Sequence, residues 1–535
     1  MKMSAKRFKL TKTAKVLLML LFVAIIGGGI FAGIKTGVIK TKTAATKTES
    51  MSQKKGDAAV PDEDGNVINT DKTDEKTINL SLDEWVGWKP IIDSNGGLST
   101  QPGSIYDELG IKVNISIIND ATQSSNALIS GNLDAAGYTI NRTAFLSKKF
   151  QDAGKNVIMP YISNFSNGGD GIIAKSSINS VNDLVGAKIG VPQFSEAHSL
   201  VVWFVNQSDL SQEDKDSIIN NLVFFATPDE AAKAFFAGQI DVAATWEPYL
   251  TQAQNMSDAH ILFSTASSSS LIMDGILFDA DFAQKYPETV SAFIEGALKA
   301  ADQYDANTTT IKKVMPMFAT ASDDDIKANC ESAKLATYAD NINLLNGTAK
   351  TIFSDMCGVW ESIGETVNHD LLNTVFDDIY VKSLAGKFDE QAVTKTDANV
   401  TITEENKQEA LDATALLQKS ATVNFIINTA KFTDSAEATQ KLDDFISIAK
   451  VLDGTIIEIA GNTDPNPYSD PTDAANQMLS QQRAETVKQY FILNGISADR
   501  IIAVGNGSSK PMVANDTEEH KAMNRRTDVS FKCIE

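Results

Sequence analysis

"EAAKAFFAGQIDVAATWEPYL", residues 230 to 250, shows the two kinds of element from which the middle of this chain of 535 residues is built. Its first half has the spacing of an amphipathic helix that ends at Gly238, and "DVAATW" (241–246) is typical of a buried strand. Helical segments also separate strand-like runs at 77–82, 111–118, 134–140, 156–162, 187–192 and 222–227. This order predicts a mostly parallel sheet with helices on both faces, followed by a mainly helical region at 285–385.

The residues that follow the predicted strands indicate a small-molecule cleft. Ligands of such sheets bind beyond the carboxyl ends of the strands. At those ends the chain places aromatic side chains beside polar ones: Trp85, Trp88, Thr139, Ser195, Glu196, Trp246 and Glu247. A single tryptophan would be assigned to the core. Several at strand ends, each beside a polar residue, predict a ligand-binding cleft.

Three motifs in this region carry a family resemblance. They are "DLVGAKIGVP" (183–192) followed by "SEAHSL", the segment at 230–250, and "YPETVSAFIEGALKA" (286–300). Together they make residues 77–387 resemble the type II periplasmic substrate-binding proteins of ABC transporters, in the taurine, nitrate and thiamine-precursor group. The resemblance implies two α/β lobes that close on a small-molecule solute without reacting it, the seven residues above as cleft lining, and an ABC permease as partner.

The charges near the strand ends bear on the class of solute. The motifs at these ends carry no Arg or Lys side chain, whereas Asp83, Glu84, Glu196, Glu247 and Asp274 lie in or beside them. This favours a neutral or cationic, ring-containing solute stacked on tryptophan. Two alternatives stay open: the acids are solvated rim residues, or backbone N–H groups bind an anion.

A second motif region lies near the C-terminus. In the helix predicted around "MLSQQRAETVKQYF" (478–491), Arg483 shares a face with Asn476 and Ser480, close to where "GNTD" (461–464) leaves its strand. A fixed guanidinium near the carboxylate of Asp464 can form an internal salt bridge. Alternatively, the two groups can bind the carboxylate and the ammonium of a zwitterion.

The ordered series "GNTD", "NQMLSQQRAETV" and "MNRRTDVSF" resembles the OmpA C-terminal-like peptidoglycan-binding domain, a small α+β fold, over residues 420–535. In that family the corresponding acid and arginine bind diaminopimelate of the peptidoglycan stem. The resemblance therefore implies that Asp464 and Arg483 bind peptidoglycan, with Asn476 in support. Asn462 stands where the family usually has His, and Arg525 and Arg526 match a motif for which a structural role is expected.

The N-terminus predicts a membrane anchor. Residues 16–34 are free of charge and follow six basic residues, so they predict a transmembrane helix with 1–15 as a cytoplasmic basic tail and the body outside the cytoplasm. The alternative is a cleaved signal peptide. The polar stretches 35–76 and 388–419 read as flexible linkers. The span contains no ionisable residue, which argues against an ion-conducting stator helix.

Composition narrows the function classes. The net charge of −22 argues against a nucleic-acid partner. Three cysteines without metal-ligand spacing predict no metal site and leave open a Cys330–Cys357 bridge or two free thiols. The four histidines are scattered, so neither a cofactor nor catalysis is predicted. The resulting hypothesis is a membrane-anchored, wall-attached solute-binding protein that serves an ABC importer or a sensor. The alternative is an envelope scaffold or stator-like protein that links membrane and peptidoglycan.

Overall fold

The computed structural model describes residues 75–534, except 269, 305, 394–399, 422–424, 426–428, 433, 434 and 466–472. The predicted cytoplasmic tail (1–15), transmembrane helix (16–34) and nearly all of the first linker (35–76) lie outside the described residues. Within the described part of the chain, no helix combines the length and the apolar character that crossing a bilayer requires.

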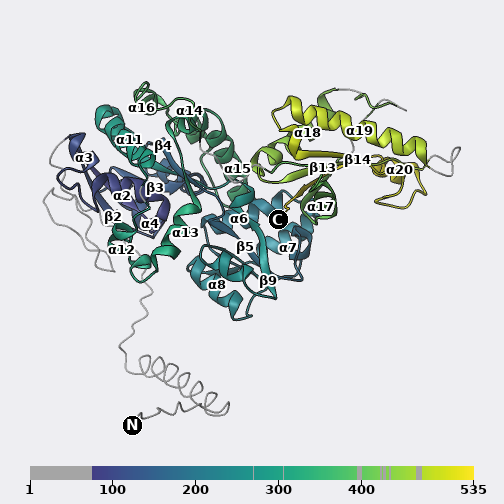
Figure 1. Ribbon diagram of the computed structural model, residues 1–535, viewed down its shortest axis with the longest axis horizontal. Helices are drawn as coiled ribbons and strands as arrows, with labels where there is room; N and C mark the ends of the chain where they lie inside the picture. The colour runs from purple at the N-terminus through teal and green to yellow at the C-terminus, as the bar shows by residue number, and fades with distance from the viewer. Residues whose placement is uncertain are drawn as a thin grey trace, which may run out of the picture. The chain divides into compact units, whose positions relative to one another are not determined.

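The first lobe is built on a mixed six-stranded sheet (Figure 1). Its strands, in spatial order, are β11 (Ala333–Leu335), β4 (Val157–Ser166), β10 (Met273–Asp279), β3 (Ala135–Thr139), β1 (Thr77–Leu82) and β2 (Lys112–Ile117). Its helices are α2 (Lys89–Asn95), α3 (Ile105–Glu108), α4 (Ala121–Ser130), α5 (Ile140–Asp152), α10 (Ala280–Lys285), α11 (Pro287–Asp302), α12 (Thr309–Val314), α13 (Asp323–Glu331), α14 (Tyr338–Asn346), α15 (Thr348–Ser362) and α16 (Ile379–Lys382). Strand β1 pairs in parallel with β2 and β3, so the helices that follow β1 and β3 begin at the same edge of the sheet.

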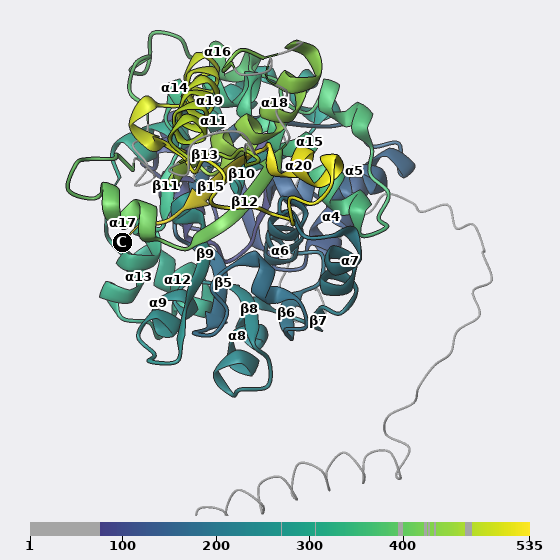
Figure 2. The same ribbon diagram turned by 90° about the vertical axis from the view of Figure 1, so that its right-hand side faces the viewer.

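The second lobe has a five-stranded sheet, whose strands Figure 2 shows side by side. In spatial order they are β7 (Val223–Phe225), β6 (Ile189–Pro192), β8 (Val242–Trp246), β5 (Asp170–Lys175) and β9 (Ala259–Ser264). Its helices are α6 (Glu196–Asn206), α7 (Gln212–Asn220), α8 (Pro228–Phe236) and α9 (Tyr249–Gln254). The segment 230–250 therefore forms most of α8 and all of β8, as its pattern predicted.

Both sheets differ from the mostly parallel arrangement predicted from the sequence. Strand β10 runs antiparallel to β3 and β4, and β5 runs antiparallel to β8 and β9. The reason is that the chain passes from the first lobe to the second after β4 and returns after β9, in opposite directions. The two crossings are tied together, because the buried hydroxyl of Thr265 accepts a hydrogen bond from Gly168 N (2.9 Å) and bonds to Ser166 Oγ (2.8 Å).

The C-terminal domain is an α+β unit with a four-stranded sheet. Its strands, in spatial order, are β12 (Ala415–Ala421), β15 (Thr527–Lys532), β13 (Ile456–Gly461) and β14 (Ile501–Gly505), and its helices are α17 (Lys407–Asp412), α18 (Ser435–Val451), α19 (Ala474–Leu493) and α20 (Glu518–Asn524). The boundary predicted at 419 is too late. Helix α17 and the start of β12 fall inside the predicted linker 388–419, because β12 pairs with β15 and buries Leu416 and Leu417.

Two glycines bring helix α19 unusually close to the C-terminal sheet. A Cβ atom on Gly461 would lie 2.3 Å from the carbonyl oxygen of Ser480, and one on Gly505 would lie 2.5 Å from the backbone nitrogen of Gln481. Because any side chain at these positions would collide with the helix backbone, both strand ends need glycine. The loop that begins at Asn462 is thereby held against the first half of α19.

The cysteines make no disulfide within the described residues. Cys330, Cys357 and Cys533 are all free thiols, so the Cys330–Cys357 bridge left open by the sequence is not formed. Cys357 is fully buried, and burial raises the pKa of its thiol to about 12.

Candidate functional site

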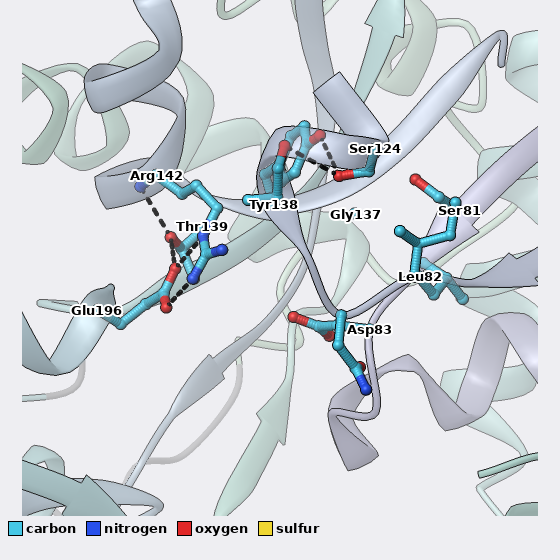
Figure 3. Close-up of a pocket in the computed structure, with 12 residues that line it drawn as sticks. Ser81, Leu82, Asp83, Ser124, Gly137, Tyr138, Thr139, Arg142 and Glu196 are labelled. Carbon is cyan, nitrogen blue, oxygen red and sulfur yellow. Dashed lines mark hydrogen bonds and ion pairs between the residues drawn. The ribbon is translucent and has the colours of Figure 1, made fainter. Parts of the chain in front are cut away.

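A narrow pocket opens at the carboxyl ends of β1 and β3 (Figure 3). Its lining comes from the first lobe, except for Glu196 from the second: Ser81, Leu82, Asp83, Ile118, Asn119, Ala121, Ser124, Gly137, Tyr138, Thr139, Arg142 and Glu196. The free space within it is about 10 Å³, close to that of one water molecule. A metabolite therefore fits only if the walls move apart.

An ion pair crosses from one lobe to the other at this pocket. Arg142, in the first turn of α5, donates to both carboxylate oxygens of Glu196, the first residue of α6, at 2.8 Å and 2.5 Å. The hydroxyl of Thr139 donates to the same carboxylate at 2.9 Å and also caps α5. Burial alone would raise the pKa of Glu196, but Arg142 outweighs it and holds that pKa below its ordinary value.

Neutral contacts accompany this ion pair, between α5 and the segment formed by α6 and the loop before it. The Asn141 side-chain amide donates to Ser199 Oγ at 3.1 Å. The rings of Phe145 and Phe194 stack with their centroids 4.7 Å apart. The two lobes thus meet through charged, polar and aromatic contacts.

Further carboxylates are buried around the ion pair. Asp274 of β10 stands opposite Thr139 of β3 and Asn164 of β4, so these side chains share one face of the sheet. Asp274 is 5% exposed and Asp170 is 8% exposed. Burial, reinforced by the neighbouring carboxylates, raises the pKa of Asp274 well above its ordinary value and that of Asp170 to about 7.

The C-terminal domain presents a second cluster of charges, just beyond β13. Asp464 makes an ion pair with Arg525 (Oδ2–Nη1, 3.0 Å). The guanidinium of Arg483 lies over the ring of Phe425, 4.9 Å from its centroid, and its Nε donates to Thr429 O at 3.2 Å. Within the described residues, no carboxylate makes an ion pair with Arg483.

Two families match the chain. The family described as NMT1/THI5 like matches residues 104–308, and the OmpA family matches residues 424–525. The chain carries an NMT1/THI5-like domain followed by an OmpA domain.

Individual proteins are similar to one domain or the other. A putative aliphatic sulfonates-binding protein of Escherichia coli is 29% identical over 137 residues, which are 26% of this chain and 40% of that protein. The peptidoglycan-binding protein ArfA of Mycobacterium bovis is 41% identical over 66 residues, 12% of this chain and 20% of that protein. The crystal structure of the periplasmic aliphatic sulphonate binding protein SsuA from Escherichia coli aligns with a TM-score of 0.43 at 15% identity, covering 57% of this chain and 99% of that one.

This chain spans half or less of the length of the curated relatives it matches. The two relatives described above are named as binding proteins and not as enzymes, in agreement with the non-catalytic interpretation of the sequence.

The structure distributes the predicted cleft residues of the NMT1/THI5-like domain unevenly. Thr139 and Glu196 line the pocket, as expected. Trp85 is half-buried, and its indole N–H donates to Asn164 Oδ1 at 2.8 Å. Trp246 is half-buried at the end of β8, opposite Asp170 in the sheet. These residues come from both lobes.

Three predicted lining residues have other roles. Trp88 is 1% exposed and packs over Gly137, so it is a core residue and not a cleft wall. The hydroxyl of Ser195 donates to Pro192 O at 2.6 Å and caps α6, so its hydrogen-bonding capacity is used locally. Glu247 accepts from the backbone and the hydroxyl of Thr251 at the start of α9, and it does not line the pocket.

Sequence reasoning missed Arg142. The inference that no basic side chain lies near the strand ends was wrong. Arg142 lies three residues beyond Thr139, in the first turn of the next helix. Because one turn of an α-helix rises only about 5.4 Å, a side chain in the first turn stays close to the end of the strand before it. Extending each motif through the first helical turn would have included it. Asn164 and Asp170 were missed for a different reason: they lie where the chain crosses between lobes.

In the OmpA domain, Asn476 donates to the backbone oxygen of Asp464 (3.3 Å) and to Asp473 (2.7 Å), so it orients the loop that carries the acid. Asn462 is buried and donates to Asp528 (2.9 Å). Arg526 also pairs with Asp528 (2.9 Å), and its side chain is only 9% exposed, which fits a structural role.

Arg525 does not have the purely structural role that its motif predicted. It is 38% exposed and lies directly on Asp464. Burial lowers the pKa of Arg483, the charge of Asp464 counteracts this, and Arg525 lowers it further. Asp464, Arg483 and Arg525 therefore form one cluster with two basic groups and one acid.

Proposed function

We propose that this protein is a solute-binding protein of the cell envelope, in which the NMT1/THI5-like domain captures a small molecule between its lobes and the OmpA domain binds peptidoglycan. One observation carries the first half of the proposal. Charged side chains from both lobes, Arg142 and Glu196, meet at the carboxyl ends of the strands, where ligands of α/β sheets bind.

Capture would proceed by movement of the lobes. Because the pocket has little free space, a solute enters only after Arg142 and Glu196 separate or rearrange. A solute that contacts both lobes stabilises the closed arrangement by the free energy of the contacts that it makes there. No bond is made or broken in this cycle.

Wall binding would use the charged cluster of the OmpA domain. Within the described residues Arg483 makes no ion pair with a carboxylate, and its guanidinium, mostly buried against Phe425, suits the carboxylate of diaminopimelate. Asp464 suits the ammonium group, which would share or replace the contact with Arg525. The family resemblance and the similarity to a protein named as peptidoglycan-binding support this assignment.

The N-terminal span would complete the arrangement. A transmembrane helix at 16–34 would hold the body at the outer face of the membrane, and the linker 35–76 would let the NMT1/THI5-like domain reach an ABC permease. Delivery to an importer and reporting to a sensor both require the same capture step.

Solute capture is tested by thermal denaturation of the full chain, purified in detergent, against a broad panel of metabolites. A true solute at 100 times its Kd stabilises the domain by about 2.7 kcal/mol, which raises the midpoint by several degrees. No response to any compound would refute solute capture and favour an envelope scaffold.

Wall binding is tested by sedimentation of the protein with purified peptidoglycan that contains diaminopimelate. Asp464→Ala and Arg483→Ala are expected to remain in the supernatant. Glu485→Ala, which removes an exposed acid from the same helix as Arg483, is the matched control and is expected to sediment like the wild type. Retention of both site variants would refute the assignment.

A further inference from the structure

We propose that the solute of the NMT1/THI5-like domain carries a cationic nitrogen group, bound by Asp274 and Asp170 between the lobes. This inference rests on the proposed function, since it names the class of solute that the domain captures. It starts from the balance of charges around Glu196.

Four carboxylates influence one another there: those of Asp83, Asp170, Asp274 and Glu196. Arg142 is the basic side chain among them, and Glu196 already holds it through two hydrogen bonds. Asp83 accepts a hydrogen bond from the indole of Trp88 at 2.7 Å. Within the described residues, Asp170 and Asp274 take part in no ion pair.

Buried acids without a cation are rare in folded proteins, because a carboxylate loses its hydration on burial. Asp170 and Asp274 are both more than nine-tenths buried. Burial raises the pKa of both carboxyl groups, and the hydrogen bonds from Ser166 to Asp170 and from Trp85 to Asp274 offset this only in part. A cationic solute would supply the missing charge.

A second observation points independently to a ligand. Asn164 is fully buried, and its Nδ2 donor has no hydrogen-bond partner, although its Oδ1 accepts from Trp85. Asn164 stands directly opposite Asp274 in the β4–β10 pair, on the same face. Buried amide donors are nearly always paired in native proteins. A solute with a hydrogen-bond acceptor close to its cationic nitrogen would satisfy Asn164 and Asp274 together.

The same residues favour an organic cation over a metal ion. The Nδ2 of Asn164 is a donor and cannot coordinate a metal. The indoles of Trp85 and Trp246 flank this region from different lobes, and aromatic faces attract organic cations. Within the described ranges, no three His, Cys, Asp or Glu side chains are grouped closely enough to hold a metal.

An anion is disfavoured by the same geometry. It would have to displace Glu196 from Arg142 and then remain near Asp83, Asp170 and Asp274. Like charges at such close range repel, more strongly in a buried site than in water. The site is therefore opposite in sign to one built for sulfonates.

The test uses the full chain and pairs of aromatic probes that differ in charge. Thermal shift and titration calorimetry would compare benzamidine and benzylamine with benzoate and benzenesulfonate at equal ionic strength, with calcium chloride as the metal probe. We expect the cationic probes to stabilise the protein and the anions and calcium to leave it unchanged. Asp274→Asn should weaken benzamidine binding at least tenfold, and Asp216→Asn, at an exposed acid of α7, should not.

Folding of Asp274→Asn is checked by its melting point without probe, which should equal or exceed that of the wild type, and Asp170→Asn provides an independent second variant. Stabilisation by the anions alone, or by calcium alone, would overturn the inference. So would unchanged benzamidine affinity in both variants. If only neutral metabolites bind, the inference fails while solute capture stands; if neither the probes nor the metabolite panel bind, both fail.

Discussion

The two candidate sites handle charge in opposite ways. Around Glu196 the NMT1/THI5-like domain buries more acids than bases, and its single arginine is neutralised by an acid from the other lobe. In the OmpA domain, two arginines surround one half-exposed acid, and Arg483 has no acidic partner within the described residues. The comparison indicates that the solvent exposure of an ion pair determines whether it mainly stabilises the fold or is available to a ligand. A buried pair constrains the fold, whereas an exposed pair exchanges readily with a ligand.

The largest effect is expected when one partner of the Arg142–Glu196 pair is removed, whose side chains are only 18% and 16% exposed. Arg142→Met leaves Glu196 largely buried and without its cation, so the domain should lose about 3–5 kcal/mol of unfolding free energy. Chemical denaturation of the full chain, followed by tryptophan fluorescence, measures this loss. The double variant Arg142→Met with Glu196→Gln should recover most of it. A loss below 1 kcal/mol in the single variant would mean that the pair is solvated, as in the OmpA domain.

The next effect is a pH dependence that the exposed cluster should not show. The pKa of Asp170 in the folded state is about 7, above its ordinary value of 3.8, so the folded protein binds a proton that the unfolded chain has released between these pH values. Stability therefore falls as pH rises through this range, by about 3 kcal/mol between pH 5 and pH 8 for this group.

Burial also raises the pKa of Asp274, so this group likewise lowers the stability of the folded protein as the pH rises. Denaturation curves at pH 5, 6, 7 and 8 would show the decline, and Asp170→Asn should flatten it. A wild type whose stability is constant over this range, or whose slope the variant leaves unchanged, would contradict the assigned pKa.

A smaller effect is expected at Thr139. Thr139→Ala removes both the hydroxyl that donates to Glu196 and the cap of α5, which together contribute about 1–2 kcal/mol. Thr139→Ser should retain most of this free energy, because it keeps the oxygen. Equal losses in the two variants would show that the methyl group, and not the hydroxyl, matters. Urea denaturation of both proteins is the measurement.

The smallest effect is expected for the more exposed pair, Asp464 and Arg525. Arg525→Gln breaks the contact with Asp464, yet stability should change by less than about 1 kcal/mol because both side chains are more than a quarter exposed. Thermal denaturation measures this change. A loss as large as that expected for Arg142→Met would remove the distinction between the two sites.

Much of the fold follows from local sequence pattern. The first strand was predicted with its observed limits, and β6, β8 and α8 were predicted nearly so. What failed depends on contacts between distant residues. Strands β5, β9 and β10 pair antiparallel because the chain crosses between lobes twice, and no short-range periodicity encodes that return. The start of β12 inside the predicted linker has the same cause, since β15 is its partner.

The site residues divide in the same way. Asp464 and Arg483 were identified because each belongs to a recognisable motif, and the structure brings both near Arg525. Arg142 was missed because its role appears only when α5 meets α6 from the other lobe. Trp88 was misassigned because an indole at a strand end can turn inward, and here it packs on Gly137.

The hydroxyl of Thr265 has a consequence for how the lobes part. Thr265 lies in the second crossing between the lobes, and its hydroxyl bonds to Ser166 and Gly168 in the first crossing. The backbone N–H of Asp170 also donates to this hydroxyl, at 3.3 Å. Because these hydrogen bonds join the two crossing segments at one point, the lobes can rotate about that point, whereas the segments cannot slide past each other. Asp170 would then lie at the pivot and keep its position when the lobes separate. It would be in place to contact an arriving solute before the lobes close.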